Sequence, residues 1–241
     1  MSGVAGAALR LAAFLYLVFQ FLVVGVALLP AALLVRAAWQ QGSLLLLVLS
    51  LAVGYLVFGF AFLALVVLAK HLTFFRSREG DYPFVSFYAL RWAFVGSLAG
   101  LAKILILQHL KGMPVLNAFY RAMGARIGRN VLINTCNMFD FDLIEIGDGT
   151  FIGGDAVVIG HLGESGLLKI RPVRIGRRCI VGQSSVVFPG AVMEDGAVLG
   201  ALSLLPKGRR LPAGTVWGGN PIREIRRDAG NDGRAAADGE P

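Results

Sequence analysis

Apolar residues recur at every sixth position along the C-terminal part of this 241-residue chain. The series consists of Ile175, Val181, Val187, Met193, Leu199, Leu205, Leu211 and Trp217. An α-helix repeats every 3.6 residues and a half-buried strand every two, so neither produces a spacing of six. The period predicts a solenoid, in which short strands joined by tight turns each place one bulky side chain in a common core.

Two further rows support this interpretation. Small residues mostly stand two positions before each apolar one, at Val173, Cys179, Ser185, Ala191, Ala197, Ser203 and Thr215, with Arg209 as the exception. An upstream block repeats the apolar series at Ile127, Ile133 and Phe139 and then, after a slip of one residue, at Ile146, Ile152 and Val158. An ordinary sandwich of short strands would have variable turn spacing. The expected fold class is therefore mainly β, a parallel β-helix.

The N-terminal part of the chain is strongly apolar. Hydrophobic residues make up 56% of the chain and charged residues only 16%, and the runs Leu11–Val35 and Ser43–Ala69 contain no charged residue. A helix of about 25 residues crosses the roughly 30 Å hydrocarbon core of a bilayer. A secretory signal peptide is the alternative for the first run, but the run is too long and a second one follows it. We expect a transmembrane helical hairpin within residues 1–83.

Cations near the two runs indicate its orientation. Arg10 precedes the first run, while Lys70, Arg76 and Arg78 follow the second. The positive-inside rule then places both ends of the hairpin in the cytoplasm, although Arg36 in the connection opposes this orientation. The expected location is the inner (cytoplasmic) membrane, with a multi-pass anchor and a cytoplasmic β-helix.

Residues 84–111 form a third apolar segment, but Arg91, Lys103 and His109 interrupt it. This pattern favours a connecting helix that lies in the membrane interface. A third span is the alternative, and it would place the rest of the chain outside. The net charge of +8 suits an anionic membrane surface or an anionic cofactor, and no motif for nucleic acid is present. Residues 112–227 would then hold the β-helix, and residues 228–241 a disordered tail.

Four stretches carry a resemblance to a known family: Gly124-Ala-Arg-Ile-Gly, Phe141-Asp-Leu-Ile-Glu-Ile-Gly-Asp, His161-Leu-Gly-Glu and Trp217-Gly-Gly-Asn-Pro-Ile-Arg. With the repeat, they make residues 112–227 resemble the hexapeptide-repeat acyltransferases. Among these, the chain looks most like one free-standing copy of the membrane-bound tandem domains that end ε-poly-lysine synthetase-like nonribosomal peptide synthetases. The resemblance implies a left-handed β-helix, usually a homotrimer, and an acyl donor that is an acyl-CoA or a carrier-protein phosphopantetheine thioester.

The repeat breaks once, because Val158 and Ile175 are seventeen residues apart. The break predicts a flexible loop that begins at His161, and loops on rigid scaffolds commonly carry function. In the acyltransferase family a histidine in such a position deprotonates the acceptor, and the resemblance assigns this role to His161. A surface histidine without function is the alternative.

A base needs a group that orients it, and two acids are candidates. Asp142 stands three residues after Phe139, as His161 stands three after Val158, so stacked coils would place Asp142 beneath His161. Glu164, which is close to His161 in sequence, is the rival. The synthetase-linked domains tend to have a second acid after this glutamate, whereas this chain has Ser165.

The chemistry needs no further nucleophile. A thioester already has a good leaving group, because a thiol has a pKa near 8.5, and an imidazole is a suitable base. Cys136 and Cys179 are therefore not expected to react, and Cys179 falls on the row of small residues. His71 and His109 lie at the membrane segments, which leaves His161 alone in the β-helix and excludes a zinc site with three histidines.

Cations near the last coils are candidates for the donor's phosphates: Lys207, Arg209, Arg210 and Arg223. Contact with anionic lipid is the alternative for them. The predicted function is acyl or aminoacyl transfer to an amine or hydroxyl of a small-molecule, peptide or lipid-linked acceptor, and amide formation is one form of it. The alternative from another class is a non-catalytic, trimeric membrane scaffold.

Overall fold

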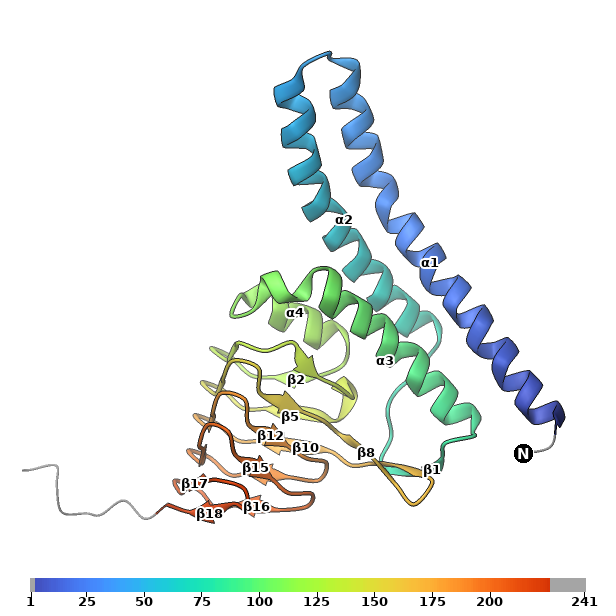
Figure 1. Ribbon diagram of the computed structural model, residues 1–241. Helices are drawn as coiled ribbons and strands as arrows, with labels where there is room; N and C mark the ends of the chain where they lie inside the picture. Colours follow the sequence, from blue (N-terminus) through green and yellow to red (C-terminus); the bar gives the residue numbers. More distant parts are fainter. Residues whose placement is uncertain (1–2, 226–241) are drawn as a thin grey trace, which may run out of the picture.

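The computed structural model describes residues 3–225 and begins with a long helical hairpin (Figure 1). Helix α1 (Gly3–Gln40) and helix α2 (Leu44–Leu72) pack antiparallel. Gly42, at φ +67°, turns the chain between them, and the Ser43 side chain accepts a hydrogen bond from Leu46 N and so caps α2. The tail expected at residues 228–241 lies outside the described residues.

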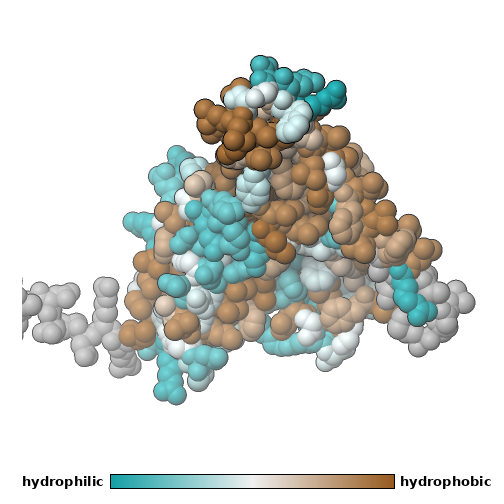
Figure 2. Space-filling view, turned by 45° about the horizontal axis from the view of Figure 1, so that its top comes forward, coloured by the Kyte–Doolittle hydropathy of each residue, from teal (hydrophilic) through white to brown (hydrophobic). Residues whose placement is uncertain are grey.

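Apolar side chains point outward from this hairpin. Phe21 and Leu44, for example, are 69% and 76% exposed. By length and composition, three helices are suited to cross a membrane: Arg10–Gln40 within α1, Leu44–Leu72 (α2) and Phe87–Leu105 (α3). Figure 2 shows a broad apolar surface over much of the molecule, with hydrophilic residues in separate patches at the top, left and bottom of the view.

A second helical layer closes the N-terminal end of the β domain. It contains α3 (Phe87–Leu105), the 3₁₀ turn η1 (Leu107–Leu110) and α4 (Pro114–Ala122). From α4, the Asn117 amide donates to Val131 O at 2.7 Å and the Tyr120 hydroxyl to Thr135 O at 3.1 Å. These bonds satisfy carbonyls of the first coil, which would otherwise be an open edge.

The β domain is a parallel β-helix with three sheets. Successive strands fall on successive sheets, so three strands complete each coil. The first sheet contains β2 (Arg126–Ile127), β5 (Ile144–Ile146), β10 (Val173–Ile175), β13 (Val192–Met193) and β16 (Arg210–Leu211). The second contains β3 (Leu132–Ile133), β6 (Phe151–Ile152), β11 (Ile180–Val181), β14 (Val198–Leu199), β17 (Val216–Gly218) and the antiparallel β18 (Arg223–Glu224). The third contains β4 (Asn137–Met138), β7 (Val157–Val158), β12 (Val186–Val187) and β15 (Leu204–Leu205).

The six-residue row forms the core, as the sequence predicted. Ile175 to Leu211 are each 2% exposed or less, whereas Trp217 is partly buried. The row of small residues from Val173 to Ser203 is also buried, whereas Arg209, the next position of the row, is exposed. Removing these side chains from water is the main force that holds the coils together.

One position of the upstream row needs correction. Met138, and not Phe139, pairs with Val158 and is buried at 2% exposure. The chain therefore takes five residues from Ile133 to Met138 and eight from there to Ile146. The additional residues form the 3₁₀ turn η2 (Phe141–Leu143), which begins after Asp140.

The excursion after Val158 is ordered. Strands β8 (His161–Glu164) and β9 (Leu167–Ile170) form an antiparallel hairpin, and β1 (Gly80–Pro83) pairs with β9. Ser165 and Gly166 both have positive φ, as the two-residue turn of a tight hairpin requires. The expectation of a flexible loop was therefore wrong, because the segment between α2 and α3 adds a third strand to it.

The expectation of a mainly β chain holds only for the C-terminal domain. Over the described residues, the helices contain more residues than the strands do. The strands are short because each coil turns after about two paired residues, while the apolar segments form long, continuous helices.

Candidate functional site

His161 occupies the first position of β8, where the chain leaves the β-helix. Its neighbour Gly160 closes the base of the hairpin, since Gly160 O accepts a hydrogen bond from Arg171 N at 2.8 Å. Pairing of His161 with Ile170 fixes the backbone. The imidazole is 26% exposed, so it is held firmly by its strand and still reaches solvent.

Asp140 is the acid that contacts this histidine. The Nδ1 atom of His161 lies 2.6 Å from Oδ2 of Asp140, whose side chain is completely buried. The same oxygen accepts a hydrogen bond from Gly160 N at 3.0 Å, and Oδ1 accepts one from Trp92 Nε1 at 2.7 Å. Asp140 has φ +59°, a left-handed conformation that aspartate tolerates better than most residues.

The hydrogen bonds assign the roles of the two imidazole nitrogens. An ionised carboxylate only accepts, so Nδ1 donates to Asp140 and Nε2 keeps its lone pair. The Trp92 ring packs against the imidazole edge-to-face, with centroids 4.7 Å apart, and the Phe139 ring lies at 6.2 Å. A buried acid thus holds the imidazole in one tautomer and one orientation, an arrangement in which Nε2 can accept a proton.

A small cavity adjoins the pair on the side of the helices. Its volume is about 40 Å³, and its walls include Phe75, Trp92, Val95, Asp140 and His161. This volume is far below the roughly 300–1,000 Å³ of a typical ligand pocket. Because Nδ1 contacts Asp140, Nε2 is the imidazole nitrogen left to accept a proton.

Asp142, the acid predicted to orient His161, has a different partner. Its Oδ1 lies 2.8 Å from Nζ of Lys70, at the end of α2, and its Oδ2 accepts a hydrogen bond from Ser77 N at 3.0 Å. The prediction was wrong because the comparison of coils began at Phe139, one residue after the true counterpart of Val158.

Glu164 does not contact His161 either. Neighbouring side chains on a strand point to opposite faces, so His161 faces α3 while Leu162 and Glu164 face the other way. Glu164 instead binds Lys169 at 3.0 Å and also Lys207. The hydrogen bond from Lys207, followed by that from Lys169, holds the pKa of Glu164 below its usual value.

A basic pocket of about 330 Å³ lies on this opposite face of the hairpin. Its lining combines Glu164 with Lys169, Arg171 and Lys207. Lys207 is therefore the one predicted donor-binding cation that the structure places in a pocket beside the hairpin.

The other predicted cations do not join it. Arg209 stacks on Trp217, with its guanidinium 5.1 Å from the ring centroid, and Arg210 binds Glu194 at 2.6 Å. Arg223 is exposed on β18, the strand that pairs with β17. The proposed cluster thus separates into Lys207 and three arginines with different surroundings.

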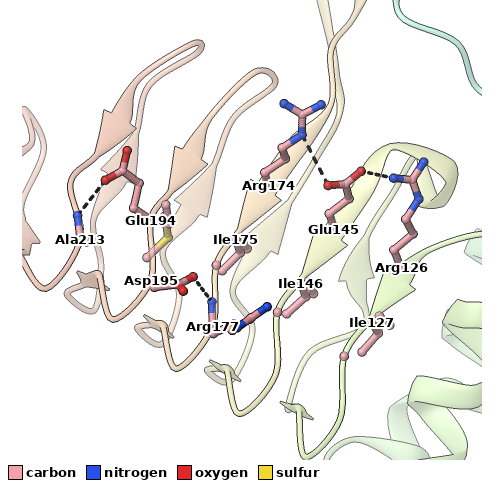
Figure 3. Close-up of a pocket in the computed structure, with 14 residues that line it drawn as sticks. Arg126, Ile127, Glu145, Ile146, Arg174, Ile175, Arg177, Glu194, Asp195 and Ala213 are labelled. Carbon is pink, nitrogen blue, oxygen red and sulfur yellow. Dashed lines mark hydrogen bonds and ion pairs between the residues drawn. The ribbon is translucent and has the colours of Figure 1, made fainter.

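A larger and more open groove, of about 800 Å³, runs along the first sheet (Figure 3). Most of its charged side chains have partners: Arg126 and Arg174 flank Glu145, and the Asp195 carboxylate accepts a hydrogen bond from the backbone N of Arg177. The groove shares no lining residue with the His161 cavity. Because it contains no histidine or cysteine, it offers neither a neutral-pH base nor a nucleophile of the kind an acyl transfer requires.

The two cysteines have the environment expected of packing residues. Both are buried, and the Cys136 thiol donates to Leu107 O at 3.1 Å. Burial raises the pKa of Cys136 to about 11 and also raises the pKa of Cys179. His71 and His109 contact Ala122 O and Tyr55, away from the site. Among residues 3–225, no three His, Cys, Asp or Glu side chains are grouped closely enough to hold a metal ion.

The sequence analysis did not identify three residues of this region. Asp140 stands in the stretch where the repeat slips, and the slip marked the segment without showing the direction of the shift. Trp92 comes from an apolar helix far away in sequence, and Lys169 comes from a strand that was taken for part of a loop. Only Asp140 left a signal in the sequence.

Comparisons with known proteins agree with this class of fold. Residues 172–201 match the family model described as the hexapeptide repeat of succinyl-transferase. A putative acetyltransferase of Bacillus subtilis, YvoF, is 34% identical over 126 residues, which cover 51% of this chain and 72% of the relative. Gamma carbonic anhydrase 1 of Arabidopsis thaliana is 30% identical over 106 residues, covering 36% and 38% of the two chains.

The delta-poly-L-ornithine synthetase of Acinetobacter baumannii gives a longer match. It is 30% identical over 175 residues, which cover 71% of this chain. The aligned residues outnumber those of the β-helix, so the similarity extends into the helical part. The chain spans only 13% of that synthetase and 38% of the carbonic anhydrase.

A parallel β-helix built from six-residue repeats places the chain in the class of hexapeptide-repeat proteins. Within this class, the chain belongs to the hexapeptide-repeat acyltransferase family. The acyltransferase class predicted from the sequence is confirmed at the level of the family.

Proposed function

We propose that the protein is a membrane-anchored acyltransferase in which His161 removes a proton from an amine or hydroxyl acceptor while that acceptor attacks a thioester. The observation that carries the proposal is the 2.6 Å contact between His161 Nδ1 and the fully buried Asp140. Asp140, in place of Asp142 or Glu164, is the residue that orients the base.

The reaction balances without any other reactive side chain. The acceptor's nitrogen or oxygen forms a bond to the thioester carbonyl carbon as its proton passes to His161 Nε2. When the C–S bond breaks, the thiolate leaves and the imidazolium returns the proton to it. A thiol has a pKa near 8.5 and is a good leaving group, so one base and correct positioning are sufficient. With an amine acceptor, the product is an amide, as in the synthesis of a peptide or a poly-amino acid.

The basic pocket supports a donor that carries phosphate, either an acyl-CoA or the phosphopantetheine of a carrier protein. Lys169, Arg171 and Lys207 line it, and ammonium and guanidinium groups bind phosphate well. The pocket and the His161 ring lie on opposite faces of the hairpin, so the donor must be long enough to pass around its edge. The phosphopantetheine arm common to both donors is long and flexible.

The contacts of α3 support the interfacial position proposed for residues 84–111. A helix that spans a bilayer places its two ends on opposite sides of it. Near the beginning of α3, Trp92 binds Asp140, and near its end Lys103 donates to Asn137 Oδ1. Both acceptors belong to the first coil of the β-helix. We therefore assign the span to the α1–α2 hairpin, with α3 along the interface, and we place the β-helix in the cytoplasm on the inner membrane according to the charges that flank the hairpin.

Outward apolar side chains support the proposed homotrimer. Leu132, Phe151 and Ile180 are 43%, 40% and 44% exposed and occupy matching positions of neighbouring strands in the second sheet. An apolar row of this kind is typical of a face that another chain covers. We also propose that the β-helix is left-handed, and this handedness rests on the family resemblance.

Donor dependence tests the proposed function. Purified protein in detergent is given an amine acceptor with either acetyl-CoA or an aminoacylated carrier protein, and wild type is compared with His161→Ala. We expect turnover with one donor, and we expect it to vanish in the variant. His109→Ala is the matched control, because His109 is exposed and its imidazole hydrogen-bonds to Tyr55 and not to Asp140. Turnover that survives in His161→Ala contradicts the proposal, and its absence in wild type with both donors favours the scaffold.

A further inference from the structure

Trp92 connects the apolar helix α3 directly to the acid–base pair. Its indole Nε1 donates to Asp140 Oδ1 at 2.7 Å, and its ring packs edge-to-face on His161 with centroids 4.7 Å apart. One side chain of a helix outside the β-helix therefore contacts both members of the pair.

The two oxygens of Asp140 have separate partners. Oδ2 accepts from Gly160 N and His161 Nδ1, both of the hairpin segment, whereas Oδ1 accepts from Trp92 alone among the residues that the structure describes. A fully buried carboxylate oxygen that loses its donor is strongly destabilised. The indole N–H therefore determines the orientation of the carboxylate and withdraws negative charge from it.

We propose that Trp92 is a positioning residue for catalysis, which acts on His161 through Asp140. The proposal rests on the assignment of His161 as the base. It makes α3 a part of the active site in addition to its role beside the membrane, because the position of this helix decides how strongly Asp140 holds the imidazole.

The charge that Asp140 presents to His161 depends on this hydrogen bond. Without the indole donor, the carboxylate attracts the protonated imidazole more strongly, and a protonated imidazole is inactive as a base. In a plot of kcat/KM against pH, the rise on the acidic side must then move to higher pH.

The other titratable groups near Asp140 and His161 have partners of their own, which the loss of the indole N–H does not remove. Lys70 and Asp142 line the same cavity but bind each other at 2.8 Å. Tyr88, on α3, hydrogen-bonds to the backbone of Arg78. Arg171, at the base of the hairpin, binds Asp81 at 2.8 Å.

Packing alone is the competing explanation, since Trp92 also contacts the small cluster of Ala89, Leu168 and Ile170. Trp92→Phe separates the two roles, because it keeps an aromatic ring in this cluster and removes the N–H. Replacement of the indole by the isosteric benzothiophene of benzothienylalanine removes the same N–H with an almost identical shape. The second substitution decides the matter if Trp92→Phe does not fold.

The test is the pH dependence of kcat/KM for the donor found to support turnover. We expect the acidic limb of Trp92→Phe to move up by roughly half to one pH unit. This is a part of the roughly one to two units that a hydrogen bond to a charged group is worth, because the indole acts on His161 through Asp140. Donor KM should stay within about twofold of wild type, because Trp92 contacts Asp140 and His161 and does not line the basic pocket.

Trp217→Phe is the matched control. It also loses an indole hydrogen bond, at 2.9 Å to Thr215 Oγ1, but in the last coil, and we expect its profile to superimpose on that of wild type. An unshifted profile in both Trp92 variants, with His161 still essential, overturns the inference alone. Turnover that persists in His161→Ala overturns the proposed function itself.

Discussion

The ammonium group of Lys70 lies 2.8 Å from the carboxylate of Asp142, and both side chains are almost completely buried. Lys70 is in the last turn of α2, and Asp142 is in the turn that begins the second coil of the β-helix. Lys70 also donates to Met123 O. Two residues before Asp142, Asp140 contacts His161. One short turn therefore binds both the helical α1–α2 hairpin and the proposed base.

Stability should depend on this ion pair. Asp142→Asn leaves a buried lysine without its counter-charge, which costs about 3 kcal/mol, and the midpoint of thermal unfolding in detergent should fall by roughly 6–12 °C. The double variant Lys70→Met with Asp142→Leu removes both charges and should recover a large part of this loss. If the single and double variants unfold at the same temperature as wild type, the ion pair does not stabilise the contact between α2 and the β-helix.

Gly124 should tolerate no side chain. A Cβ there would meet Asp142 Oδ1 at 2.2 Å and Lys70 Nζ at 2.8 Å, and the residue has φ +104°. Gly112 also has a positive φ, of +73°, but open space around it. Gly112→Ala should therefore cost only the backbone strain, about 1 kcal/mol, and Gly124→Ala clearly more. Equal unfolding midpoints for the two variants would contradict the close packing at the ion pair.

Removal of the Glu164 carboxylate should improve donor binding. Glu164 binds Lys169 and Lys207 in the basic pocket, so Glu164→Gln releases two ammonium groups for the donor's phosphates. We expect donor KM to fall about two- to threefold while kcat stays unchanged, in line with the small strength of exposed ion pairs. Lys207→Ala should raise KM, and Arg223→Ala, with no part in the pocket, should leave it unaltered. A large loss of kcat in Glu164→Gln would instead restore Glu164 as the partner of His161.

Cys136 should resist alkylation in the folded protein. With its pKa raised to about 11 by burial, only about one thiol in a thousand is ionised at pH 8, and the thiolate is the reactive form. Iodoacetamide should label Cys136 at pH 8 only after denaturation, and Cys136→Ser should retain turnover. Rapid labelling of the native protein, measured by mass spectrometry of the Cys136 peptide, would show an accessible thiol.

The sequence predicted the repeating architecture well, because each inward residue from Ile175 to Leu211 obeys one local rule. The same rule located His161, since a break in a regular repeat shows where the chain leaves the core. The apolar hairpin was equally evident from two uninterrupted runs.

The partners of His161 depended on information that a single repeat does not contain. With Met138 as the counterpart of Val158, Phe141 corresponds to His161 and Asp140 corresponds to Gly160. The register therefore explains why Asp142 does not lie beneath His161, whereas the contact between Asp140 and His161 joins neighbouring positions of two coils, which the repeat does not predict. Trp92 and β1 approach from the segments around α3, and their contacts arise from tertiary packing that no local pattern encodes.

Turnover of Asp140→Asn and Asp142→Asn, measured side by side well below their unfolding midpoints, tests the central claim most directly. An asparagine at position 140 keeps the shape but not the charge that holds the imidazole in the reactive tautomer. We expect kcat to fall by roughly a hundredfold or more in Asp140→Asn, as in other enzymes whose histidine loses its acid. Asp142→Asn should keep kcat within about twofold of wild type, because its cost is in stability. The opposite result, an active Asp140→Asn and an inactive but folded Asp142→Asn, would contradict the account.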